Sequence, residues 1–278
     1  MVDGVRGIRV LDGEEANKYL EIINIFHNVA QKYDCAFIKI PTIEKDELFT
    51  RTVGENTDIV TKQMFSFPDK KGRNLVLRPE GTAGVVRHHI DKKYNKIKKY
   101  YYSDQMFRYE RPQKGRYREF HQVGAEIIGY ENDSIAEIFS IIQLSNDFLE
   151  NCIPTNTKYT FEINSIGTNE DRKIYNQKLK EYFKKNIDNL SDDSIKRLDK
   201  NPLRILDSKD KSDIAVSRNA PKLSEFRSEE SNKKFNELIQ MLKNSKIPYL
   251  ENPFLVRGLD YYNDFTFEIV PENSKGSQ

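Results

Sequence analysis

The chain has 278 residues, and its 45 lysines and arginines nearly balance its 43 aspartates and glutamates, for a formal net charge of +2. With 37% hydrophobic residues, this composition excludes a chain that is disordered throughout and gives only weak support for nucleic-acid binding. The length is enough for one large domain or two. There is no apolar run long enough to span a membrane, and the N-terminus lacks the apolar stretch of a signal peptide. We therefore expect a cytoplasmic protein with no membrane partner.

The first part of the chain alternates helices and strands. Apolar residues at helical spacing predict a helix over residues 12–33, and Asp12 with Glu15 resembles a capping box at its start. Further on, the pattern predicts strands over 36–40 and 74–77, a turn at 78–82 and a helix over 82–90. Residues 97–110 and 119–130 favour strands because they are rich in aromatic and β-branched side chains. With the loop 111–118 between them, they predict a long antiparallel hairpin.

The later part of the chain changes in character. The pattern predicts a helix over 132–150 and a strand over 159–164. The sequence then becomes polar and mostly helical, with helices expected over 171–186 and 231–244, before strand-like sequence resumes at 253–256 and 261–270. We therefore predict a core over 1–167, an inserted helical domain over 168–250 and a return to the core over 251–278. Long antiparallel pairing with few short crossovers predicts an α+β fold rather than a doubly wound parallel sheet.

One face of the strand at 119–130 combines polar and apolar groups. Its two-residue period places these side chains together: Phe120, Gln122, Gly124, Glu126 and Ile128. The face resembles the floor of a ligand pocket in which Gly124 leaves room. Burying Glu126 without a partner is costly, so a cation, a donor-rich ligand or an arginine must satisfy it. An exposed sheet face or an internal arginine pair explains the pattern equally well.

Positive charge is concentrated in the hairpin loop. The side chains that carry it are Arg108, Arg111, Lys114, Arg116 and Arg118. Such a group suits a triphosphate or an RNA backbone, because guanidinium forks bind phosphate oxygens in a bidentate fashion. A solvated basic turn is the alternative for the loop itself. Arg108 lies between Phe107 and Tyr109 within the strand, so we expect its side chain to point at a partner.

Two turns carry further candidate residues. The turn from Arg78 to Thr82 places a carboxylate and a hydroxyl at the start of a helix, where Glu80 and Thr82 can hold an ammonium group. An ordinary helix N-terminus with Thr82 as the cap is the alternative. Arg257 precedes a glycine that permits a tight turn and can aim the side chain inward, although such an arginine is more often at the surface.

The side chains that commonly bind metals or attack substrates give little signal. The two cysteines, Cys35 and Cys152, match neither a disulfide framework nor the spacing of metal ligands, so free thiols and no protein-bound metal are predicted. None of the four histidines has a Ser, Cys or carboxylate partner at motif spacing, which argues against a nucleophilic triad.

Taken together, several segments resemble the histidyl-tRNA synthetase family of class II aminoacyl-tRNA synthetases. The segments are FRYERPQKGRYREFHQVGAEIIG (107–129), LRPEGTAG (77–84), VRGLDYY (256–262), TRTVGENTDIV (50–60) and NPLRILDSK (201–209). The resemblance covers nearly the whole chain. It implies an antiparallel sheet flanked by helices, a helical insertion domain at 168–250, and a homodimer whose interface involves the region ending at Pro41.

The resemblance also implies a role for each matching residue. The implied histidine-binding residues are Glu80 and Thr82 at the amino group, Gln122 and Arg257 at the carboxylate, and Glu126, Tyr261 and Tyr262 around the imidazole, with Gly81 and Arg108 in the same site. The implied ATP-binding residues are Arg108 at the α-phosphate, Glu110 on the adenine side, Arg116 at the γ-phosphate and Phe120 stacked on adenine. Arg108 and Arg257 are the implied catalytic residues, with Mg²⁺ on the phosphates.

The implied reaction joins L-histidine to ATP, giving histidyl-adenylate and pyrophosphate, and then transfers histidine to the 3′ end of tRNA(His). Residue chemistry agrees with this substrate. Neutral imidazole offers one donor and one acceptor, so a site must present an acceptor such as Glu126 and a hydroxyl such as that of Tyr262.

The sequence departs from the family pattern at both ends. The family begins with Arg-Gly, an Asp three residues on and a Pro before the first helix, whereas Arg6 and Gly7 are followed here by Val10 and Gly13, which leaves the role of this segment open. The sequence ends at Gln278, before the expected glycine-rich strand, motif 3 and anticodon-binding domain. We therefore expect a fragment with an incomplete ATP site and reduced or no activity alone.

Two non-catalytic alternatives remain. A regulatory paralogue of ATP phosphoribosyltransferase resembles the same core and also lacks the anticodon-binding domain, but that class typically loses catalytic residues that are in place here. An RNA-binding fragment would depend on the lysine-rich stretch 92–99 and the basic hairpin loop, and would show a steep salt dependence.

Overall fold

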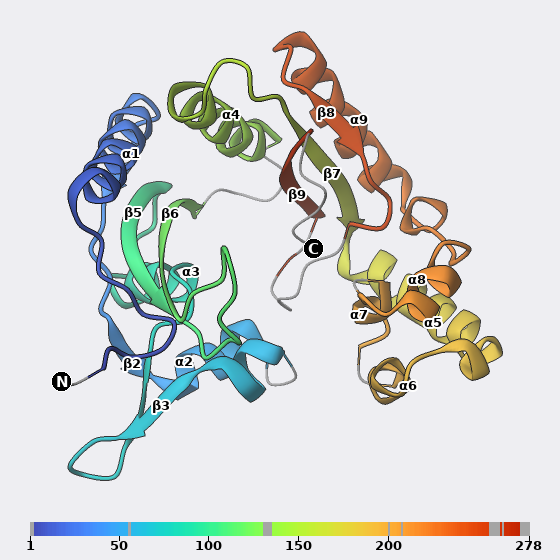
Figure 1. The fold of residues 1–278 in the computed structure, drawn as a ribbon. Helices are drawn as coiled ribbons and strands as arrows, with labels where there is room; N and C mark the ends of the chain where they lie inside the picture. Colours follow the sequence, from blue (N-terminus) through green and yellow to red (C-terminus); the bar gives the residue numbers. More distant parts are fainter. Residues whose placement is uncertain are drawn as a thin grey trace. The chain divides into compact units, whose positions relative to one another are not determined.

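The computed structural model describes residues 3–54, 57–129, 135–199, 201–206, 208–255, 262 and 264–272. The chain divides into two compact units, Met1–Pro154 and Thr155–Gln278 (Figure 1). The predicted domain boundaries at 167/168 and 250/251 differ from this division and stay a prediction. Both cysteines are free thiols, as expected. Among the helices of the described residues, none is long and apolar enough to cross a membrane.

A long hairpin forms the centre of the first unit. Strands β5 (Lys98–Phe107) and β6 (Glu119–Ile128) pair antiparallel from Lys98 opposite Ile128 to Phe107 opposite Glu119, and the short strand β1 (Ala36–Phe37) lies parallel to β5. The predicted hairpin is confirmed, with both strands a few residues shorter than expected. The register places the even-numbered residues of both strands on one face, as the alternation of β6 predicts.

Helices cover both faces of this hairpin. Helices α1 (Gly13–Lys32) and α4 (Ile135–Cys152) pack on the odd-numbered face, where Tyr101 lies among buried residues of both helices. Helix α3 (Thr82–Asp91) covers the even-numbered face, where Val85 packs with Tyr100, Tyr102 and Met106. The even-numbered face is therefore buried on β5 and half-buried on β6 under α3, so the alternative of an exposed sheet face is wrong.

The capping box predicted for the first helix is absent. Asp12 occupies the N-cap position with an extended backbone, but its side chain makes no capping hydrogen bond. Glu15 instead pairs with Arg9 at 2.6 Å. The Glu15 carboxylate, which the capping box would have required, is therefore paired with Arg9.

A second, smaller sheet leads into α3. Its strands are β2 (Ile43–Lys45), β4 (Asn74–Leu77) and β3 (Phe65–Pro68), in the antiparallel order β2-β4-β3. Helix α2 (Asp46–Val53) and the π-helix η1 (Ile59–Gln63) connect β2 to β3. Strand β4 matches its prediction, and the turn that follows it delivers residues 78–82 to the start of α3.

The second unit combines a three-stranded sheet with a group of helices. Strand β7 (Tyr159–Gly167) pairs parallel to β8 (Tyr249–Glu251) and antiparallel to β9 (Asp264–Pro271). The helices are α5 (Asn169–Lys185), α6 (Asp192–Leu198), α7 (Leu203–Leu206), α8 (Lys211–Ser217) and α9 (Glu229–Asn244), with 3-10 turns η2 (Ile187–Asn189) and η3 (Leu223–Glu225). The strand predicted at 253–256 is wrong over its described residues, 253–255, and residue 256 lies outside the described part of the chain. Residues 252–255 form a turn, in which Leu255 N donates to Asn252 O, and Pro253 favours that turn.

Two buried aspartates join the helix starts of the second unit. Asp213 accepts hydrogen bonds from the hydroxyls of Ser191, Ser194 and Ser208 at 2.6 to 2.7 Å. Asp171 does the same for Ser231 at 2.6 Å and for the backbone of Thr168 and Ser228. Each carboxylate thereby satisfies groups from several segments that would otherwise be buried without partners.

Candidate functional site

Glu80 closes the N-terminus of α3. Its side chain is 5% exposed, and its two carboxylate oxygens accept hydrogen bonds from the backbone N–H groups of Thr82 at 2.8 Å and Ala83 at 2.9 Å. The first N–H groups of a helix have no partner within the helix, so a carboxylate here is doubly favourable. The alternative with Thr82 as the cap is wrong, because Gly81 holds the N-cap position. Burial raises the pKa of Glu80, while these hydrogen bonds and the charge of Arg108 oppose the shift.

Thr82 connects Glu80 to Glu126 on the hairpin. Its hydroxyl donates to Glu126 Oε1 at 2.7 Å, while its backbone N–H binds Glu80. Burial raises the pKa of Glu126 to about 7, and the negative charge of Glu80 adds to this shift. Two carboxylates thus meet at one threonine inside the unit, an arrangement that attracts an ammonium group or N–H donors.

The space beside Gly124 is filled by a tyrosine. Tyr102 lies directly opposite Gly124 in the hairpin, and a Cβ atom on Gly124 would be 2.3 Å from its Cζ. A Cβ atom on Gly81 would come equally close to the same ring atom. The expectation that Gly124 leaves room for a ligand is therefore corrected, since both glycines make room for the phenol ring of Tyr102, which is 5% exposed.

Arg108 points toward the Glu80 turn, as expected for a strand arginine with a partner. Its Nε donates to Pro79 O at 2.9 Å, and its guanidinium carbon lies 5.0 Å from the centre of the Phe120 ring. Phe120 packs against the buried residues of the even-numbered face. The hairpin end and the start of α3 thus bring a cationic and an aromatic side chain to the two carboxylates.

The hairpin loop is folded rather than extended. Gln113 and Arg116 exchange backbone hydrogen bonds at 3.1 and 2.9 Å around Gly115, whose φ is +80°. Arg116 pairs with Glu110 at 3.7 Å. A cavity of about 320 Å³ opens beside this loop, lined by Arg6, Tyr109, Glu110, Arg111, Pro112 and Arg118. Three arginines line this cavity, so an anion would be favoured there.

A buried ionic network supports the turn at residues 78–82. Arg78 is 1% exposed and donates to Gln105 O at 2.7 Å and Ile40 O at 2.5 Å, and it pairs with Asp104 at 3.1 Å. Lys39 also pairs with Asp104. Sequence reasoning missed this network. The signal that could have found it was Asp104 itself, since an aspartate on a core-facing strand position requires a cation.

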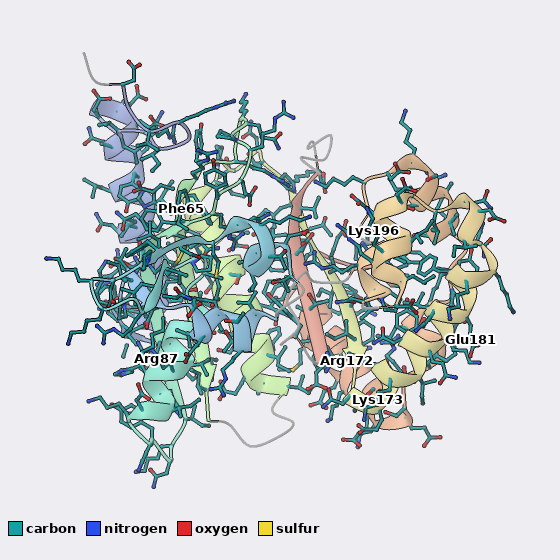
Figure 2. The ribbon with its side chains drawn as sticks, turned by 90° about the horizontal axis from the view of Figure 1, so that it is seen from below. Phe65, Arg87, Arg172, Lys173, Glu181 and Lys196 are labelled. Atoms are coloured by element: carbon teal, nitrogen blue, oxygen red, sulfur yellow. The ribbon has the colours of Figure 1, made fainter. Side chains whose placement is uncertain are left out.

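Of four other predicted site residues, the structure describes two, Gln122 and Tyr262. Gln122 lies opposite Asp104 on the same face as Glu126. Tyr262 belongs to the second unit, where its carbonyl accepts a hydrogen bond from Arg172, labelled in Figure 2, and its ring packs on the helical core. Arg257 and Tyr261 lie outside the described residues. The structure therefore assembles Glu80, Thr82, Glu126, Arg108 and Phe120 within one unit, next to Gly81 and Gln122.

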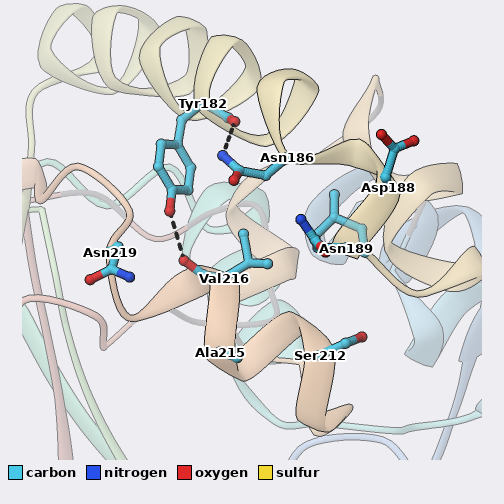
Figure 3. Close-up of a pocket in the computed structure, with 9 residues that line it drawn as sticks. Tyr182, Asn186, Asp188, Asn189, Ser212, Ala215, Val216 and Asn219 are labelled. Atoms are coloured by element: carbon cyan, nitrogen blue, oxygen red, sulfur yellow. Dashed lines mark hydrogen bonds between the residues drawn. The ribbon is translucent and has the colours of Figure 1, made fainter.

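The second unit has a cavity that the sequence did not predict. It measures about 520 Å³ and is lined by Tyr182, Asn186, Asp188, Asn189, Leu190, Ser212, Ala215, Val216 and Asn219 (Figure 3). Tyr182 donates its hydroxyl to Val216 O, and Asn186 donates to Tyr182 O, both at 2.9 Å. These polar groups already bind within the chain, so they stabilise the cavity wall.

Comparison with known proteins identifies relatives over the whole chain. A family model described as "Histidyl-tRNA synthetase" matches residues 7–277. The chain is 44% identical to the chloroplastic histidine--tRNA ligase of Pyropia yezoensis over 278 residues, which cover 99% of this chain and 64% of that protein. The structure of apo S. aureus histidyl-tRNA synthetase aligns with a TM-score of 0.74 at 32% identity, and the alignment covers 97% of this chain and 61% of that one.

A third comparison concerns the regulatory alternative. A Bacillus halodurans structure, described as an ATP phosphoribosyltransferase regulatory subunit/histidyl-tRNA synthetase, aligns with a TM-score of 0.65 over 98% of this chain and 73% of that one. Its identity is 21%, so this likeness shows the fold alone. The fold is that of a class II aminoacyl-tRNA synthetase, an α+β fold with helices flanking antiparallel strands. The family match and the close relatives confirm the resemblance read from the sequence, and the chain belongs to the histidyl-tRNA synthetase family.

Proposed function

We propose that this chain carries the amino-acid activating site of a histidine–tRNA ligase, which joins L-histidine to ATP and transfers it to tRNA(His). The observation that supports this most directly is the meeting of Glu80 and Glu126 at Thr82, with Arg108 and Phe120 beside them. The carboxylates suit the nitrogens of histidine, and the arginine with its aromatic neighbour suits a nucleotide. The chain spans 64% of the length of the Pyropia yezoensis relative, so the activity of the whole protein is part of this proposal.

Histidine would bind through its charged and polar ends. The α-ammonium group would contact Glu80 and Thr82 near Gly81, and the α-carboxylate would contact Gln122 and Arg257. The imidazole would contact Glu126, with Tyr261 and Tyr262 completing its surroundings. An amino acid without imidazole nitrogens would leave Glu126 with Thr82 as its hydrogen-bond partner and no donor from the ligand, and sites that leave polar groups unpaired discriminate by about 10⁴- to 10⁵-fold.

ATP would bind along the hairpin and its loop. Arg108 would contact the α-phosphate, Arg116 the γ-phosphate and Glu110 the adenine side, while Phe120 would stack on the base. Arg116 is paired with Glu110 at 3.7 Å, so binding requires it to exchange a carboxylate for a phosphate. Both partners are anionic oxygens, to which a guanidinium fork can donate paired hydrogen bonds. Mg²⁺ would enter with the triphosphate, whose oxygens are its preferred ligands, and neutralise phosphate charge.

The proposed chemistry needs positioning more than proton transfer. The histidine carboxylate attacks the α-phosphorus, pyrophosphate leaves, and negative charge builds on the phosphoryl oxygens. Arg108 would stabilise that charge from a side chain already held by Pro79 O, so little reorganisation is needed during the reaction. Arg257 is the second proposed catalytic arginine.

We also propose a homodimer in the cytoplasm. The region ending at Pro41 leaves an apolar side chain in solvent, with Phe37 at 56% exposure. Phe37 lies on β1, at the edge of its sheet, where an unpaired strand invites a partner. A second copy of the chain would cover this surface.

A thermal-shift panel tests the proposed activity at its first step. The chain is melted with histidine and with several other amino acids, beside the variant Glu126→Gln and the control Glu21→Gln, whose glutamate is exposed on α1. Ligand at 100 times its dissociation constant stabilises by about 2.7 kcal/mol, which a melt detects easily. We expect a shift with histidine alone, lost in Glu126→Gln and kept in Glu21→Gln.

Other outcomes of this panel count against the proposal. The absence of a shift with any amino acid would contradict a histidine site in this chain. A shift with histidine that persists in Glu126→Gln would contradict the assigned imidazole partner. Capture of ATP phosphoribosyltransferase by a chain that binds histidine without forming the adenylate would favour the regulatory function.

A further inference from the structure

The segment before the first helix is bonded to the hairpin loop. Gly7 O accepts hydrogen bonds from the backbone N–H of Arg118 at 2.7 Å and of Glu119 at 3.4 Å, and Arg6 O accepts from the Arg118 guanidinium at 3.4 Å. In Figure 1 the dark blue N-terminal segment passes beside the start of β6, where these bonds form. We call residues 6–9 the N-terminal clasp.

Gly7 fits the clasp because it has no side chain. Its φ is +85°, a conformation that L-residues with a Cβ atom rarely adopt. A Cβ atom there would also lie 2.9 Å from Pro112 Cγ and 3.0 Å from Arg118 Cγ, so the loop would have to move. Both the backbone and the available space therefore require glycine at the point where the clasp meets the loop.

Arg118 links Gly7 to the proposed ATP-binding residues. Its carbonyl accepts a hydrogen bond from Arg108 N at 2.9 Å, and its Nε donates to Glu110 O at 3.2 Å. Its guanidinium carbon lies 3.9 Å from the centre of the Tyr109 ring. One side chain and one peptide group thus hold the three consecutive residues Arg108, Tyr109 and Glu110 against the clasp.

The clasp is fastened at its other end to α1. Arg9 lies over the ring of Tyr117 at 4.4 Å and pairs with Glu15 in the first turn of α1 at 2.6 Å. From the opposite side, Tyr109 N donates to Gln63 O at 2.7 Å, and the Tyr109 ring meets Phe65, labelled in Figure 2, edge-on. The loop base is therefore held between two parts of the first unit that are far apart in sequence.

From these contacts we propose that Gly7 and Arg118 are positioning residues for ATP, acting through Arg108 and Glu110. The inference rests on the proposed function, because it takes the loop as the nucleotide site. A loop that is already held in its binding conformation does not lose conformational freedom when the ligand binds, so the affinity for the nucleotide rises. In the proposed site histidine would contact mainly Glu80, Thr82 and Glu126, and it shares only Arg108 with the residues that the clasp positions, so a change in the clasp should affect ATP more than histidine.

The test compares Gly7→Ala with Gly4→Ala in the full chain. A Cβ atom added to Gly4 would meet no atom of the described residues within 4 Å, and the φ of Gly4 lies outside the left-handed region, which makes it a matched control. The dissociation constants of ATP and of histidine are measured by calorimetry, and hydrogen exchange follows residues 108–118. We expect Gly7→Ala to raise the dissociation constant of ATP about tenfold or more and to leave that of histidine within about twofold of the wild type. Hydrogen exchange in the loop should become faster, because the loop loses the contacts that hold it in place. Gly4→Ala should match the wild type.

A second pair of variants separates positioning from direct phosphate binding. Arg118→Lys keeps the charge but loses the planar guanidinium that stacks on Tyr109, and Arg118→Gln loses both. Positioning predicts that the two variants weaken ATP alike, whereas direct phosphate binding predicts that Arg118→Lys retains most of the affinity.

The outcomes distinguish failure of the proposed role of the clasp from failure of the proposed function. Wild-type chain that binds neither ATP nor histidine would overturn the proposed function and the role of the clasp toward ATP. Wild-type chain that binds both, with Gly7→Ala binding ATP normally or losing both ligands equally, would overturn the clasp alone.

Discussion

Thr82 is the residue at which the two acidic groups of the site meet. It donates its backbone N–H to Glu80 and its hydroxyl to Glu126, so one residue sets the separation of two carboxylates that come from different elements. The two carboxylates differ in the hydrogen bonds that oppose the effect of burial on their pKa. Two N–H groups at a helix start support Glu80, whereas one hydroxyl supports Glu126, whose pKa rises to about 7. Burial thus raises the pKa of both carboxyls, and that of Glu126 reaches about 7.

This pKa predicts that Glu126 lowers stability above neutral pH. An unfolded glutamate loses its proton near pH 4.5 and the folded Glu126 near pH 7, so the folded state holds the extra proton between these values. The free energy of unfolding must then fall as pH rises through this window. We expect Glu126→Gln to raise it by about 1 to 3 kcal/mol at pH 8, since each pKa unit is worth about 1.4 kcal/mol, and to change it little at pH 4.5. Urea titrations at both pH values measure this.

The control for this prediction is Glu21→Gln, which should be neutral at both pH values because its carboxylate is exposed. An equal effect of Glu126→Gln at pH 4.5 and pH 8 would contradict the titration and leave packing as its cause. Stabilisation at pH 8 together with loss of histidine binding would show that the carboxylate is kept for binding, at the expense of stability.

The sequence predicted which residues of β6 share a face, but not what each would meet. Alternation places Gln122 and Glu126 together because the period of a strand is fixed by its backbone. The contact of Glu126 with Thr82 joins residues 44 positions apart, and the filling of Gly124 by Tyr102 depends on the register of two strands. Both follow from tertiary packing, which periodicity does not specify.

At the scale of elements, long regular segments were predicted better than short ones. The hairpin of β5 and β6 was predicted because tyrosines and β-branched residues favour strands over ten positions. The three-residue strand β8 was placed too late in the chain, since its pairing with β7 rather than its own composition makes it a strand. The capping box predicted at Asp12 is wrong for a related reason: Glu15 forms an ion pair with Arg9, a contact that the local sequence pattern does not specify.

The helices of the second unit depend on buried carboxylates as much as on apolar packing. Asp213 is fully buried and accepts hydrogen bonds from three serines in two segments, Ser191 and Ser194 at the start of α6 and Ser208 before α8. Burial raises the pKa of this carboxyl, but the bonds from Ser208, Ser191 and Ser194 outweigh it, so the pKa is lowered. Such a group contributes its stability above the pKa of an unfolded aspartate and loses it as pH falls through the lower folded value.

We therefore expect Asp213→Asn to destabilise the second unit by about 1 to 3 kcal/mol at pH 7, because an amide cannot accept all of these hydrogen bonds. The difference from the wild type should shrink as the pH falls below about 4, where the unfolded aspartate gains its proton. Hydrogen exchange in α6 and α8 as a function of pH measures the effect. Asp188→Asn, on the exposed turn η2, is the control, and an equal loss in both variants would contradict the role of the serine cluster.

At the scale of the whole molecule, the exposed apolar side chains of the first unit bear on the proposed homodimer. Phe37 is 56% exposed although it contacts Tyr101, and it lies on the edge strand β1. Phe67 on β3 is 37% exposed and lies in the other sheet of the same unit. The two phenylalanines thus offer a matched pair, one inside the proposed interface and one outside it.

We expect Phe37→Arg to shift the chain from dimer to monomer in sedimentation velocity, because a charge in an apolar interface would be buried without a partner. Phe67→Arg should sediment like the wild type. Both variants must also keep the melting temperature of the folded unit, so that loss of the dimer is not loss of the fold. A wild-type chain that is monomeric at all concentrations, or equal dissociation by both variants, would contradict an interface at β1.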